Sequence, residues 1–135
     1  MSVETVIVPG WPQPRGYANG MVAEGRVLYV AGQIGWQADG TWAHSDLAGQ
    51  FGQALRNVLA VVRAAGGDIA SIASLTVYVT DVGAYRRDHK AVGAEYRAVL
   101  GKHFPAMALV GVTELVEPNA LVEIQAYCAL LSDAA

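Results

Sequence analysis

The sequence predicts an α+β fold, with a mixed β-sheet covered on one face by two helices. Two segments have the apolar periodicity of helices, and the segments around them have the patterns of strands, in the order β-β-β-α-β-α-β-β. The chain of 135 residues contains no repeat, low-complexity segment or linker, so we expect a single domain over residues 1–135. This length can bury a core without disulfide bonds, which one cysteine cannot form within the chain.

The N-terminal part of the chain is predicted to supply strands. Residues 4–8 are a short strand candidate, and Glu24-Gly25-Arg26 is typical of a hairpin turn. Residues 26–34 form a stronger strand candidate with a continuous apolar run. The small pair Ala31-Gly32 and then Gln33 lie near its end, where small residues allow another backbone or a ligand to approach closely.

Two amphipathic helices are predicted, with a strand over residues 71–80 between them. Ser45 or Asp46 can cap the first helix, which ends at Gly66-Gly67. Asp81 is the expected cap of the second helix, and Gly101 is its expected end. The second helix has one apolar face, formed by Tyr85, His89, Val92, Tyr96 and Val99.

The last part of the chain is predicted to form two strands joined by a tight turn. Residues 106–115 are apolar, and residues 116–119 contain the turn formers Pro and Asn. Residues 121–131 alternate, which places Glu123 on the face opposite Val122 and Ile124. Because an unpaired buried carboxylate is costly, we expect Glu123 at an edge, in a cleft or at an interface. A turn centred near Glu117 would pair Glu123 with about Val112.

The apolar character of the chain predicts a homo-oligomer. Only 16% of the residues are charged, and the mean hydropathy is +0.30. Strand residues 106–112 are apolar on both faces, whereas the two helices can cover only one face. We therefore expect a second copy of the chain to cover the other face.

Composition and motifs argue against several classes of function. The net charge of -3 and the lack of a basic run do not favour nucleic-acid binding. No apolar stretch reaches the roughly 18 residues of a membrane span, and no signal peptide is evident, so a cytoplasmic protein is expected. The chain has no phosphate-binding loop, dinucleotide fingerprint, HExxH motif or metal-spaced Cys/His cluster, and we expect no metal and no cofactor.

Several blocks of the sequence carry a family resemblance that spans nearly the whole chain. The blocks are Tyr17, LYVAGQIG (28–35), FGQALRNVLAVVRAAGG (51–67), TVYVTD (76–81), FPA (104–106) and LVEIQAYC (121–128). Together they resemble the RidA family, also called YjgF/YER057c/UK114.

The resemblance implies a fold, an assembly and a chemistry. It implies a chorismate-mutase-like α+β fold and a homotrimer with ligand clefts between its subunits. It also implies the hydrolysis of reactive enamines and imines to ketoacids and ammonia, without a metal or cofactor. An endoribonuclease label is also used for the family, but the acidic balance of this chain does not favour that activity.

The chain departs from the family pattern where a substrate carboxylate would bind. The pattern has an arginine after Phe-Pro-Ala, and this chain has Met107, which offers no hydrogen-bond donor. Ala31 replaces a serine, and Gly93 stands where deaminating members often have an asparagine. Tyr17, Gly32, Gln33 and Glu123 match the pattern.

The matched residues predict a cleft with acid–base chemistry. Glu123 would activate a water or transfer a proton, and Tyr17 would orient or stack on a ligand. Backbone amides near Gly32 and Gln33, next to Ala31, would polarise a carbonyl. Met107, Leu109 and Trp36 would make the pocket apolar.

Two functions remain open at this point. The first is a hydrolase or proton-transfer catalyst for a small apolar or aromatic substrate without a free α-carboxylate, rather than a 2-aminoacrylate deaminase. The alternative is a non-catalytic trimer that binds a small molecule or regulates a partner. Glu123 would then be structural, for example in an ion pair with Arg15 or Arg26 of another subunit. Whether Glu123 and Met107 share a pocket depends on assembly.

Overall fold

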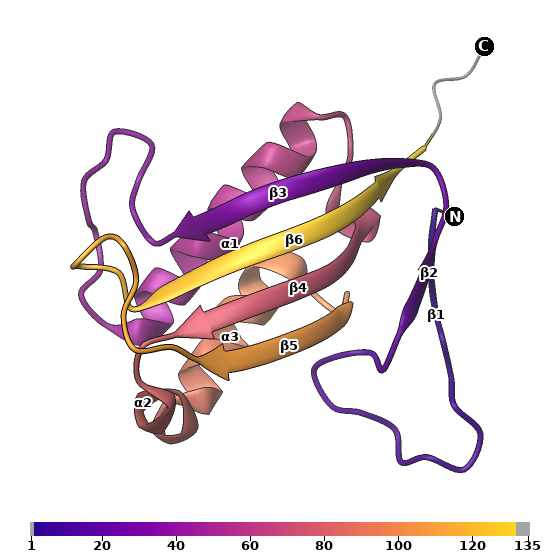
Figure 1. Ribbon diagram of the computed structural model, residues 1–135, viewed down its shortest axis with the longest axis horizontal. Helices are drawn as coiled ribbons and strands as arrows, with labels where there is room; N and C mark the ends of the chain where they lie inside the picture. Colours follow the sequence, from indigo (N-terminus) through magenta and orange to yellow (C-terminus); the bar gives the residue numbers. More distant parts are fainter. Residues whose placement is uncertain (1, 132–135) are drawn as a thin grey trace.

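The computed structural model describes residues 2–131 as a sheet with helices on one face, plus a small separate sheet (Figure 1). The main sheet has four strands in the order β3-β6-β4-β5. Strand β3 (Arg26–Ile34) is antiparallel to β6 (Val122–Leu130), and β6 is antiparallel to β4 (Ile72–Val79). Strand β5 (Ala106–Gly111) is parallel to β4. The predicted α+β class and mixed sheet are confirmed.

The predicted C-terminal hairpin is wrong, because β4 lies between β5 and β6 (Figure 1). Residues at the end of β4 form hydrogen bonds with the backbone groups that would have paired with each other in such a hairpin. The Val112 amide donates to the Val79 carbonyl at 2.9 Å, and the Thr80 amide donates to the Leu121 carbonyl at 3.2 Å. Glu123 therefore lies opposite Ile34 and Tyr78, not Val112. The helical connection from β4 to β5 is what allows these two strands to be parallel.

The first helix, α1 (Leu47–Ala64), agrees with its prediction. Asp46 is the N-cap and accepts a hydrogen bond from the Gly49 amide at 3.3 Å. The apolar face of α1 is fully buried against the sheet and α3, where Leu55 and Val58 are not exposed at all. This face forms the centre of the core.

The second predicted helix is divided into α2 (Val82–Arg87) and α3 (His89–Leu100). Asp81 caps α2 as expected, accepting from the Ala84 amide at 3.0 Å. The division falls at Asp88, a residue type that is a poor helix former. The His89 ring nitrogen Nδ1 hydrogen-bonds the Arg86 carbonyl at 3.1 Å, which satisfies a helix-end acceptor.

The small sheet pairs β1 (Val3–Thr5) with β2 (Met21–Ala23) and lies to the side of the main sheet (Figure 1). The hairpin predicted at residues 24–26 is wrong, because β2 pairs with β1 and not with β3. Gly25 instead turns the chain from one sheet into the other with a φ of 125°. A Cβ at this position would also collide with the Leu130 carbonyl oxygen, so the turn requires glycine.

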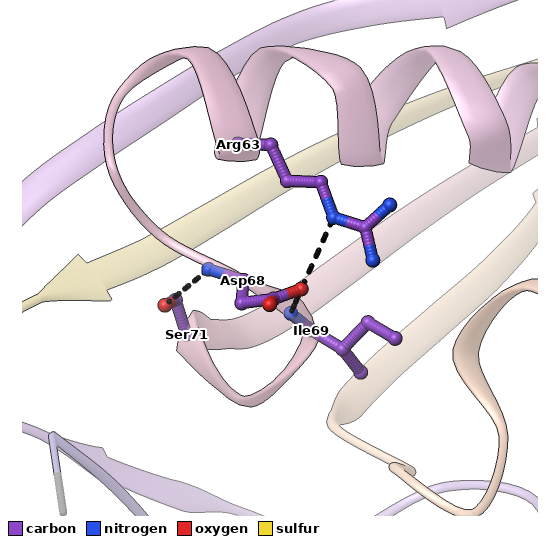
Figure 2. A network of polar contacts seen from close by, with 4 residues as sticks. All are labelled: Arg63, Asp68, Ile69 and Ser71. Atoms are coloured by element: carbon purple, nitrogen blue, oxygen red, sulfur yellow. Dashed lines mark hydrogen bonds and ion pairs between the residues drawn. The ribbon is translucent and has the colours of Figure 1, made fainter.

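A polar network fixes the connection between α1 and β4, where the short helix η1 (Ile69–Ser71) begins (Figure 2). The Asp68 carboxylate accepts from the Ile69 amide at 2.8 Å and from Arg63 Nε at 3.2 Å. The Asp68 amide donates to the Ser71 hydroxyl at 3.0 Å. The Ile69 amide, and then Arg63, hold the pKa of Asp68 below its usual value.

The sheet face away from the helices, called the open face below, carries exposed aromatic and apolar side chains. Tyr29 is 72% exposed and Tyr127 44%, and their rings meet edge to face with centroids 5.4 Å apart. Val27 and Val110 are also exposed. The prediction that strands are apolar on both faces is thus confirmed, and the homotrimer stays a prediction. No helix in residues 2–131 is long and apolar enough to cross a membrane.

Candidate functional site

A β-bulge in β3 creates the first half of the candidate site. Val30 pairs with Ala126 and Gln33 with Ile124, so β3 has one more residue than β6 between these pairs. The extra residue falls at Ala31 and Gly32, and a bulge of this kind interrupts the regular ladder. The predicted use of backbone amides near Gly32 and Gln33 by a ligand stays a prediction.

The Glu123 side chain lies over Gly32. A Cβ at position 32 would come within 2.7 Å of Glu123 Cδ and Oε2, so this arrangement requires a glycine. Glu123 is half-buried on the open face, and its carboxylate has no hydrogen bond or ion pair within residues 2–131. The side-chain nitrogen Nε2 of Gln33 donates to the Ala31 carbonyl at 3.1 Å. The bulge and Glu123 together form what we call the Glu123 cluster: Ala31, Gly32, Gln33 and Glu123.

Tyr17 and Met107 belong to a second group of residues at the edge strand β5. The Ala18 amide donates to the Pro105 carbonyl at 3.0 Å, and Ala18 bridges to Ala106. These contacts hold Tyr17 beside the start of β5. Met107 lies opposite Leu75 of β4, on the helix side of the sheet, where it packs against the core.

The α3 pocket is a cavity of about 330 Å³ on the helix side of β5. Phe104 and Tyr96 form one wall, with parallel rings whose centroids are 5.4 Å apart. The Tyr96 hydroxyl donates to the His103 carbonyl at 2.6 Å, and burial raises the pKa of Tyr96 above its usual value. The cavity is lined by Arg15, Gly16, Tyr17, Phe51, Tyr85, His89, Val92, Gly93, Tyr96, Arg97, Phe104, Met107 and Leu109.

Sequence reasoning missed the two arginines of this pocket. Arg15 follows the irregular Pro-rich segment, whose path no periodicity predicts. Arg97 carries a clearer signal, because it lies four residues after Gly93 on one helix and both therefore share a helix face. A Cβ at position 93 would be 3.3 Å from Arg97 Nη1, so the guanidinium lies over the glycine.

The structure thus separates the predicted site residues into groups. The Glu123 cluster lies on the open face, whereas Met107 lies on the helix side. Trp36 belongs to neither group. It lies after β3, and the centroid of its ring is 6.2 Å from that of Trp42. It was expected to line the pocket with Met107, but it does not line the α3 pocket. Its place is set by Asn57 of α1, which donates to the Trp36 carbonyl at 2.8 Å.

Tyr17 and Met107 also line a second hollow of about 400 Å³ at the same edge. This hollow includes Ser74, Thr76 and Ala108, whose side chains alternate with the core residues of β4 and β5 and therefore lie toward the open face. The edge of β5 is consequently the place where the two sides of the sheet meet. Among residues 2–131 there is no group of three or more His, Cys, Asp or Glu that could hold a metal ion.

The comparisons with known proteins agree with this fold. The sequence profile of the family described as Endoribonuclease L-PSP matches residues 12–130. A RutC family protein of Pyrococcus horikoshii is 31% identical over 124 residues, which are 91% of this chain and 94% of the relative. A protein of Escherichia coli K12 named 2-iminobutanoate/2-iminopropanoate deaminase is 34% identical over 105 residues, 76% of this chain and 78% of the relative.

A solved structure extends the agreement to the arrangement of the elements. The crystal structure of YyfB from Yersinia pestis, a protein of unknown function of the conserved Rid family, superposes with a TM-score of 0.86 at 30% identity. The superposition covers 96% of this chain and 100% of the YyfB chain. With the profile match over most of its length, the chain belongs to the RidA (YjgF/YER057c/UK114) family.

Proposed function

We propose that this protein is a cofactor-independent hydrolase of the imine deaminase type, which acts in clefts between the subunits of a homotrimer. The observation that carries the proposal is the Glu123 carboxylate, which is held over Gly32 beside a strand bulge and has no polar partner within residues 2–131. The name of the Escherichia coli relative supports this reaction class. The substrate would be a small apolar or aromatic imine.

The proposed reaction needs one water and one acid–base group. Glu123 takes a proton from a water whose oxygen attacks the imine carbon, and then passes this proton to the nitrogen, which gives a carbinolamine. Proton transfer back through Glu123 then assists collapse of the carbinolamine to a carbonyl compound and ammonia. Amides of the bulge near Gly32 would stabilise negative charge that develops on the oxygen, and Tyr17 of a neighbouring subunit would orient the substrate.

Met107 argues against 2-imino acids as the preferred substrates. An arginine binds a carboxylate through two parallel hydrogen bonds, whereas a thioether provides no donor. Met107 and Leu109 instead present apolar surface in the α3 pocket. A substrate without a free α-carboxylate suits this surface better than 2-aminoacrylate and its imine.

The test is Glu123→Gln, assayed by ammonia release from a panel of imines and by thermal melting. The amide keeps the size of the side chain but removes its charge, so we expect turnover to fall at least about a hundredfold. Glu114→Gln is the matched control, because it makes the same change at an exposed site outside the cluster. Unchanged turnover together with a lower melting temperature would contradict the proposal and assign Glu123 to an ion pair between subunits.

The alternative of a binding protein without turnover is favoured by one observation. The α3 pocket is formed within one chain, and its lining residues include no carboxylate that could act as a general base. A trimer that binds a ligand there and releases no ammonia from any imine of the panel would support this alternative.

A further inference from the structure

The α3 pocket has a positive charge that neither the fold nor the proposed mechanism uses. Its lining residues include Arg15 and Arg97, both of them exposed, and no Asp or Glu. Neither guanidinium has an ion pair or hydrogen bond within residues 2–131. By contrast, Arg56 and Arg63 pair with Glu95 and Asp68.

The position of the Arg97 guanidinium depends on Gly93. Long side chains on a helix lean toward its N-terminus, so Arg97 extends back over the position four residues earlier. Glycine there leaves Arg97 Nη1 only 3.3 Å from where a Cβ would stand. A larger side chain would fill the space that the guanidinium occupies. Glycine within a helix lowers helix stability relative to alanine, and here it leaves room for the cation.

The other walls of the pocket are largely apolar and aromatic, and they also include Tyr17, Tyr85 and His89. Phe104 and Tyr96 stack in parallel, and Met107 and Leu109 project from β5 on the same side. The Tyr96 hydroxyl is already engaged with the His103 carbonyl, so this wall presents ring surface to a ligand. A volume of about 330 Å³ is in the range of small-molecule sites.

We propose that the α3 pocket binds a carboxylate carried on an aromatic or alkyl body. Arg97 takes the carboxylate, Arg15 adds positive potential, and the body packs on Phe104, Tyr96 and Met107. Binding of this ligand class does not depend on the proposed function. Only the claim that the ligand is also a substrate rests on the proposed imine hydrolysis. The acid group then lies on Arg97 at the α3 wall, and not on residue 107, where the family pattern has its arginine.

Isothermal titration of the full chain with phenylacetate and with its neutral isostere phenylacetamide tests the proposal. We expect the acid to bind about tenfold more tightly than the amide, because a hydrogen bond to a charged group is stronger. Arg97→Gln should abolish this preference. Arg86→Gln should retain it, because Arg86 is exposed on α2 and does not line the pocket.

A second variant separates the position of the charge from its presence. Gly93→Leu keeps both arginines but occupies the space under the guanidinium, so the acid-to-amide ratio should fall toward one in a folded protein. Equal binding of acid and amide by the unmodified protein, no binding of either, or the same loss in Arg86→Gln would overturn the inference. Acid preference without ammonia release would leave the inference standing and count against the proposed function. Turnover of neutral imines without a preference for the acid would support the proposed function and overturn the inference about carboxylate binding.

Discussion

Gly32→Ala offers a sharp test of the Glu123 cluster, because it adds a single carbon next to the proposed acid–base group. That carbon would lie 2.7 Å from Glu123 Cδ and Oε2 and 2.9 Å from Cγ. Carbon atoms in contact prefer a separation of about 3.5–4.0 Å, so the carboxylate must move by roughly 1 Å. The obstacle is the far end of a flexible side chain, so the backbone need not move.

The expected result is a large effect on turnover with a small effect on stability. Alanine at a compatible backbone position stabilises by about 0.4–1 kcal/mol through the unfolded chain. A displaced Glu123 rotamer costs about 0.5–1.5 kcal/mol, so the free energy of unfolding should change by no more than about 1 kcal/mol. A misplacement of about 1 Å can reduce turnover a hundredfold.

The assay is ammonia release from the best imine of the panel, with urea denaturation on the same samples. Gly20→Ala is the control, because its new carbon would be an ordinary 3.7 Å from Val6 Cβ. Gly32→Ala added to Glu123→Gln should cause no further loss, since both changes act through one carboxylate. Full activity of Gly32→Ala, or fully additive losses in the double variant, would refute the role given to Glu123.

Three further predictions follow from other parts of the structure. Met107→Arg should raise ammonia release from 2-iminopropanoate, because it adds a carboxylate fork to the pocket; an unchanged rate would show that position 107 does not select substrates. Gln50→Leu should lower the free energy of unfolding by about 3 kcal/mol in urea denaturation, because it leaves the Leu121 amide and two carbonyls without their hydrogen bonds. Burial raises the pKa of the Cys128 thiol to about 11. Because the unfolded chain ionises first, the stability from this group should be fully retained below about pH 8.5 and fall toward pH 11. Cys128→Ala should lack the loss between about pH 8.5 and pH 10, above which the raised pKa of Tyr96 adds a loss of its own.

The local elements were predictable because each is encoded by a period or a cap. The strand over residues 26–34 agrees with β3. Asp46 and Asp81 cap the helices that follow them. The alternation after Leu121 correctly places Val122 and Ile124 in the core and Glu123 on the opposite face.

The pairing of strands was not predictable from such local patterns. Residues 106–115 and 121–131 are neighbours in sequence, and turn formers between them are typical of a hairpin. Strand β4 nevertheless enters between them, because β6 buries one face completely and is paired on both edges. The small pair Ala31-Gly32 was expected to let another backbone or a ligand approach. The group that lies over Gly32 is instead the Glu123 side chain, which could be identified only once β3 and β6 were in register.

The predicted site residues lie on different parts of the sheet, so association through the open face would decide whether they meet. Glu123 lies on that face, together with the exposed rings of Tyr29 and Tyr127, which a second copy would cover. Tyr17 and Met107 lie at the edge of β5, where the α3 pocket and the hollow toward the open face share both residues. A second copy that packed on the open face with its own β5 edge beside Glu123 would bring these two groups of residues together. Subunit association would then complete the reaction site in the same step that buries the apolar face, so that only the assembled protein is expected to be active.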